Sequence, residues 1–142
     1  MEAVLIVSGA SMGYLFGSGD RVRFSSVEPE SLRLGDIIVF LHPEPGRLFL
    51  IHRLVWKTGS GERLRFWTKP DAAFHLDAPL SRVNVVGRVT AFEPSGGRWI
   101  ELDSAGARAK HVLIGLFSNI FFRYEPKLRL KAVLNAIARP AR

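Results

Sequence analysis

Short apolar runs, each bounded by turn-forming residues, recur along the first hundred positions of the chain. Several alternate between apolar and polar positions, which is typical of strands that bury one face. The cluster Thr58–Gly61 predicts the tip of a hairpin, since an apolar run lies on either side of it. The predicted strands are residues 3–8, 21–25, 36–41, 48–57, 63–69, 83–92 and 98–102. Short strands at this spacing predict a mainly β fold, a coiled antiparallel sheet or partly open barrel.

The pattern changes beyond about residue 104. The segment His111–Phe122 is apolar, and Leu128–Ala138 mixes apolar and basic residues with helical periodicity. Pro126 is expected to separate the two segments or to open the second helix at its first turn. We therefore expect a β domain over residues 1–105 and a C-terminal tail with helical segments over residues 106–142.

Charge is divided unevenly between these two parts. Residues 1–105 hold equal numbers of basic and acidic side chains, whereas residues 106–142 hold eight basic side chains and one acidic side chain, Glu125. The tail therefore carries the whole net charge of +7. An anionic partner for the tail is the natural expectation. Nucleic acid is not expected as that partner, since no recognition helix or RNA-binding platform accompanies the charge.

Composition narrows the class of protein further. A chain of 142 residues with 47% hydrophobic residues is long and apolar enough for one globular domain. The absence of cysteine excludes disulfides and thiolate metal sites, and the four histidines show no ligand spacing, so we expect neither a metal nor another cofactor. No apolar run is long enough to span a bilayer, and residues 1–7 do not resemble a signal peptide. A cytoplasmic or peripheral membrane location is the corresponding expectation.

The first candidate for chemistry is Ser11, which follows the first predicted strand. A nucleophilic serine needs an exposed hydroxyl on a rigid mount and a backbone N–H nearby for the oxyanion. The small residues Gly9 and Ala10 leave room for a substrate backbone to approach. Serine and glycine are also common in ordinary connections between strands, so the local sequence alone favours a simple turn.

A second candidate, His52, lies inside the apolar run of residues 48–56. Alternation along a strand places His52 on the face opposite Arg53. An imidazole with a carboxylate partner is the usual form of a general base near neutral pH. Asp71 and Asp77 follow the next predicted strand, and either could supply that carboxylate, or serve as a turn residue or surface charge.

Five short motifs follow one another along the chain. In order they are Ser11-Met12 with Gly19-Asp20, Gly35-Asp36 entering an apolar run, Ile51-His52-Arg53, Thr68-Lys69-Pro70-Asp71, and Val85-Val86-Gly87-Arg88-Val89. This order resembles the superfamily of signal peptidase I and the SOS repressors, which are serine endopeptidases. The resemblance covers roughly residues 3–92.

The resemblance also selects a branch of the superfamily. Bacterial signal peptidases and SOS repressors pair the serine with a lysine base, whereas the position here holds His52, as in the archaeal and endoplasmic-reticulum type. By analogy Ser11 is the nucleophile, Asp77 orients His52, and Asp71 supports the site. Gly9 and Met12 would line the oxyanion site and substrate groove. Lys57 and Lys69 are the remaining lysines that could act as base, and neither is well placed.

Several positions depart from the family pattern. Gly13-Tyr14 replaces the Glu-Pro that follows Ser-Met, and Pro70 replaces the glycine before the aspartate. No N-terminal membrane anchor is expected, because only ten residues precede Ser11. The resemblance thus implies cleavage of a leader-like or precursor peptide. It does not imply that this peptide is a secretory signal peptide.

Two alternatives follow from the same residues. The fold could be retained in a non-catalytic binding or assembly protein, given the changes at Gly13-Tyr14 and Pro70. Separately, residues 111–142 could contact an anionic membrane surface or could pack as a helix on the sheet.

Overall fold

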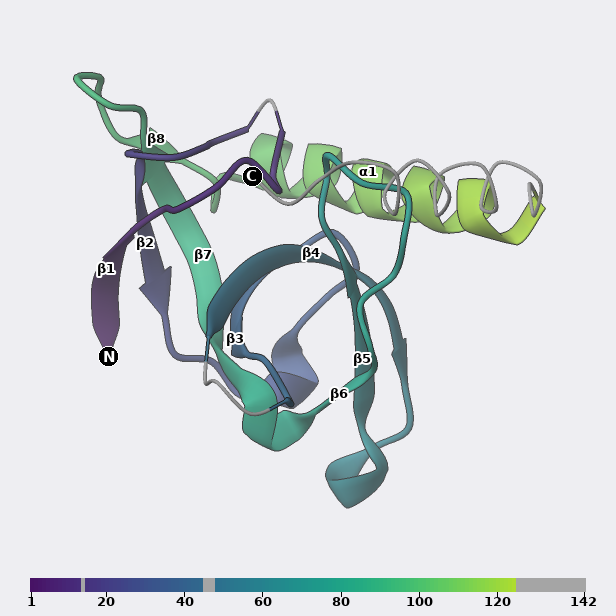
Figure 1. Cartoon of the computed structure of the whole chain (residues 1–142). Coiled ribbons are helices and arrows are strands. Elements are labelled where there is room, and N and C mark those ends of the chain that lie inside the picture. Colours follow the sequence, from purple (N-terminus) through teal and green to yellow (C-terminus); the bar gives the residue numbers. More distant parts are fainter. Residues whose placement is uncertain (14, 45–47, 125–142) are drawn as a thin grey trace.

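The structure, a computed structural model, describes residues 1–13, 15–44 and 48–124. The predicted mainly β architecture is confirmed: a curled antiparallel sheet forms a half-barrel, and one helix lies near the C-terminal side (Figure 1). The described strands are β1 Glu2–Ile6, β2 Arg21–Ser25, β3 Ile37–Leu41, β4 Phe49–Thr58, β5 Arg65–Lys69, β6 Leu80–Ser81, β7 Val85–Glu93 and β8 Ile100–Glu101. The helix is α1, Ala105–Tyr124.

The strands lie in the order β1-β2-β7-β3-β4-β5-β6, with β8 paired to β7. The register shifts within the pairings β2–β7, β3–β7 and β4–β5. Such irregularities bend a strand and increase its twist, which explains why the sheet curls instead of lying flat. The central strand β3 is buried at all of its first four positions because the curled sheet surrounds it.

Two apolar clusters form the core. One gathers Met12 and Phe16, from the chain between β1 and β2, around Phe92 of β7. The other packs Phe40 of β3 against Phe66 of β5, and both rings are fully buried. Burial of such a side chain stabilises the fold by roughly 1.5–3 kcal/mol. The first cluster also fixes the position of the chain that carries Ser11.

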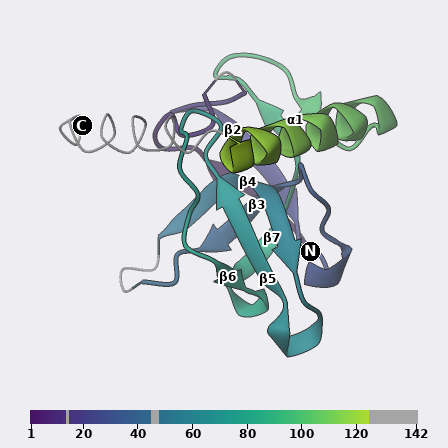
Figure 2. The ribbon, with the colours of Figure 1, turned by 90° about the vertical axis from the view of Figure 1, so that its right-hand side faces the viewer.

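The N-terminal part of helix α1 packs on the β body, and the helix extends beyond the sheet (Figure 1). Its N-terminus is capped by Ser104, whose hydroxyl accepts the Ala107 N–H at 3.2 Å. Figure 2 shows α1 lying across the end of the curled sheet, above β4. The helix backbone approaches the chain at Gly35 so closely that a Cβ built there would lie 2.1 Å from the His111 carbonyl oxygen.

Most of the predicted strand boundaries shift by one or two residues in the structure, and two features differ more. The two-residue strand β6 was not predicted, and the helix begins six residues before the predicted apolar segment, whose first residue is His111. Pro126 and Leu128–Ala138 lie outside the described residues. Within the part of the chain that the structure describes, no helix is long and apolar enough to cross a membrane.

Candidate active site

His52 and Asp77 form a direct pair. His52 lies in β4 and is buried, and its Nδ1 lies 2.6 Å from the Asp77 Oδ2. The Asp77 carboxylate is itself fixed, because the Thr68 hydroxyl donates to Oδ2 at 2.6 Å and the Asp77 N–H donates to the Thr68 carbonyl at 2.9 Å. A carboxylate on Nδ1 selects the neutral tautomer whose Nε2 carries a free lone pair. Nε2 is therefore the atom of His52 that can accept a proton.

Ser11 lies at the turn that follows β1, with its side chain exposed. Its carbonyl accepts the Ala72 N–H at 2.9 Å, and the adjacent Met12 is buried in the core. Neither the hydroxyl nor the N–H of Ser11 makes a hydrogen bond with another described residue. The serine therefore has a fixed backbone and two polar groups available for a ligand.

Gly9 adds open space beside this turn. Its φ is +96°, a left-handed conformation that favours glycine, and no atom lies within 4 Å of the position that a Cβ would occupy. The structure thus brings His52 and Asp77 into contact and ties Ser11 to Ala72, in the segment that leads to Asp77. It shows no hydrogen bond between Ser11 and His52.

Asp71 has a different partner. Its two carboxylate oxygens accept from Arg53 Nε at 2.8 Å and Arg53 Nη2 at 2.6 Å. Arg53 is 1% exposed and also donates to the Gly35 carbonyl at 3.0 Å. The carboxylate partner of His52 is therefore Asp77, while Asp71 pairs with the buried guanidinium of Arg53.

Sequence reasoning missed His111. Its Nδ1 lies 2.7 Å from Arg53 Nη1, which makes the imidazole an acceptor and links α1 to the Arg53–Asp71 pair. Burial, reinforced by the positive charge of Arg53, lowers the pKa of His111 from 6.5 to about 4. No local signal could identify this contact, since it joins residues 58 positions apart.

The pKa of His111 predicts a loss of stability in acid. Between about pH 6.5 and pH 4, only the unfolded chain binds the proton, so the free energy of unfolding falls as the pH falls through this window. We expect the loss to be about 1–2 kcal/mol, since partial solvent exposure reduces the full electrostatic value. Urea unfolding of the wild type and His111→Asn at pH 7 and pH 4.5 measures it. The asparagine amide oxygen can still accept from Arg53 but does not titrate, so an equal loss in both proteins would contradict this role.

The two Gly-Asp motifs serve the fold. Asp20 accepts the N–H groups of Gly17 and Ser95 at 2.8 Å each, and these two bonds lower its pKa. Gly35 and Asp36 pair with Leu54 of β4 through backbone bonds of 2.8 and 2.7 Å. Burial raises the pKa of Asp36.

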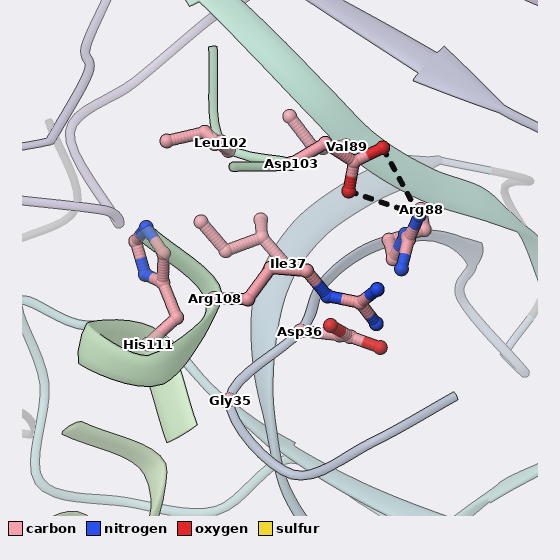
Figure 3. Close-up of a pocket in the computed structure, with 9 residues that line it drawn as sticks. All are labelled: Gly35, Asp36, Ile37, Arg88, Val89, Leu102, Asp103, Arg108 and His111. Carbon is pink, nitrogen blue, oxygen red and sulfur yellow. Dashed lines mark hydrogen bonds and ion pairs between the residues drawn. The ribbon is translucent and has the colours of Figure 1, made fainter. Parts of the chain in front are cut away.

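Figure 3 shows the small cavity beside Asp36, where Arg88 forms an ion pair with Asp103 at 3.0 Å and Arg108 approaches from α1. The cavity measures about 20 Å³, which is room for about one water molecule. Such a small space suits a structural role.

The two lysines considered as alternative bases are both bound to backbone carbonyls. Lys57 Nζ donates to the Glu30 and Leu32 carbonyls at 2.8 Å each. Lys69 is buried, its Nζ donates to the Pro70 carbonyl at 2.9 Å, and burial lowers its pKa. His52 is the better-placed base, because its Nε2 has no such partner among the described residues.

No cluster of three or more candidate metal ligands occurs within residues 1–13, 15–44 and 48–124. Comparison of the chain with protein-family models and with curated proteins finds no match.

Proposed function

We propose that the chain is a serine endopeptidase of the signal-peptidase-like type, with Ser11 as nucleophile, His52 as general base and Asp77 as the residue that orients the base. The observation that carries this proposal is the pair His52–Asp77, since a carboxylate on Nδ1 of the buried imidazole leaves Nε2 ready to accept a proton. The order of motifs along residues 3–92 supports the same conclusion.

In the proposed mechanism, His52 Nε2 removes the proton of the Ser11 hydroxyl while Oγ attacks the carbonyl carbon of a peptide bond. The Ser11 N–H, which has no partner among the described residues, donates to the oxyanion. The imidazolium then protonates the leaving amine, and the peptide C–N bond breaks. Water, activated by His52, hydrolyses the ester and restores the free serine.

Two strand edges support binding of an extended substrate. Strand β1 pairs only with β2, so its other edge is unpaired among the described strands. Strand β4 pairs with β5 only from Arg53 onward, which leaves one edge of its first residues, Phe49–His52, without a described partner. A peptide can add to such edges through main-chain hydrogen bonds.

A non-catalytic binding protein is the second candidate, because the structure shows no bond between Ser11 and His52. A fluorophosphonate, which phosphonylates activated serines, separates the two candidates. We expect intact mass and peptide mapping to find one adduct on Ser11, retained in the control Ser18→Ala. Absence of an adduct on Ser11 in folded protein would favour the binding protein.

A further inference from the structure

A cavity of about 540 Å³ lies beside Ser11, and the proposed mechanism does not use it. Helix α1 contributes one wall through positions 107, 110, 111 and 114, which lie on one helical face. The hairpin of β7 and β8 supplies a second wall. Met12, directly after Ser11, and Asp71, directly before Ala72, line the third. The bond between Ser11 and Ala72 joins the two chain segments that supply this third wall.

The lining is apolar with an excess of positive charge. Ile100 and Ile114 stand among its apolar side chains, and Ile100 is 46% exposed although it lies beside the cavity. Of the charged lining groups, Arg53 is paired with Asp71, and Glu101 is paired with Arg23. Lys110 forms no ion pair with the described residues, whereas Lys69 Nζ donates to the Pro70 carbonyl in the field of the nearby Asp71 and Asp77 carboxylates. The cavity thus offers apolar contact and, at Lys110, one ammonium group without an ion-pair partner.

A substrate that adds parallel to β1 would have the residues before its scissile bond beside that strand, and the residues after it would continue past Ser11 toward Met12 and the cavity. We infer that this cavity is the subsite for the leaving side of the substrate, and that it takes an apolar side chain accompanied by a carboxylate. This inference rests on the proposed function. The volume suits a segment of two or three residues, since small-molecule pockets measure roughly 300–1,000 Å³.

Binding to the full chain carrying Ser11→Ala tests the inference without requiring hydrolysis. The probes are acetyl-Phe-Leu-Asp-amide and its counterparts with Asn or Lys in place of Asp, measured by isothermal titration calorimetry at low salt. We expect the Asp peptide to bind at least about 10-fold more tightly than the Lys peptide, because opposite charges attract at a partly buried site. Adding Lys110→Glu should abolish this preference, whereas the exposed and distant Arg63→Glu should preserve it.

A second pair of variants tests the apolar part. Ile114→Trp should fill the cavity and weaken binding of the Asp peptide at least about 10-fold, while Leu113→Trp, whose position is 66% exposed and outside the lining, should not. Equal binding of the three peptides would overturn the inference, as would binding of dodecanoate without any peptide. If the wild type cleaves peptides but the affinity is unchanged in both variant pairs, the subsite is contradicted and the proposed function is retained. If the affinities follow the expected pattern but no peptide is cleaved, the cavity is a binding site and the proposed peptidase function is contradicted.

Discussion

Ser11→Ala is expected to reduce peptide cleavage by about 10⁴-fold or more, because the substitution removes the hydroxyl that attacks the peptide bond in the proposed mechanism. His52→Ala should cause a loss of similar size, since the two residues act as one unit. The measurement is kcat/KM on the best substrate from a peptide library, with Ser18→Ala as the control that retains activity. Residual cleavage within 10-fold of the wild type in both Ser11→Ala and His52→Ala would contradict the assignment.

Substitutions of the two aspartates should have different effects in the same assay. Asp77→Asn is expected to lower kcat by about 10³–10⁴-fold in a folded protein, because the amide cannot hold the His52 tautomer that the carboxylate holds. Asp71→Asn instead removes the negative charge that pairs with the buried Arg53. Its main effect should therefore be on the free energy of unfolding. The reverse pattern would assign the orienting role to Asp71.

Gly35→Ala is expected to cause the largest loss of stability. At φ +94° the new Cβ would lie 2.1 Å from the His111 carbonyl oxygen and 2.6 Å from the Val112 nitrogen. Both are backbone atoms, so α1 must move away from the sheet, and its packing and the Arg53–His111 contact are lost. We expect at least about 3 kcal/mol of destabilisation, measured by urea unfolding.

Gly19→Ala is the matched control for this substitution. Its φ of +91° is nearly the same, but no atom lies within 4 Å of the new Cβ. The control therefore isolates the backbone strain, about 1–2 kcal/mol, from the steric clash with the helix. Equal destabilisation by the two substitutions would mean that α1 does not pack on Gly35 as described.

The sequence predicted the β architecture because strand signals are local. Strand β2 falls on the predicted residues 21–25, where alternation is clear. Strand β6 was missed because two residues are too short for any periodicity to register. Helix α1 begins before the apolar segment because its N-terminus is set by the cap residue and not by hydrophobicity. Ser104 is a typical N-cap residue and marks this start in the sequence.

The candidate site was predictable only in part. Alternation placed His52 and Arg53 on opposite faces, and the structure agrees, since His52 contacts Asp77 while Arg53 contacts Asp71. The choice between the two aspartates depends on the path of the chain after β5, which residue spacing does not determine. The contact of His111 with Arg53 depends on how α1 docks, and that docking is set by the close approach at Gly35.

The central claim is that His52, held by Asp77, activates Ser11. The most direct test is the rate at which a fluorophosphonate labels Ser11, followed by intact mass in the wild type and in His52→Ala. We predict a single adduct mapped to Ser11 in the wild type, formed at least about 100-fold more slowly in His52→Ala, because general-base assistance is worth 10²-fold or more. An equal labelling rate in the two proteins, or no adduct on Ser11, would contradict the claim.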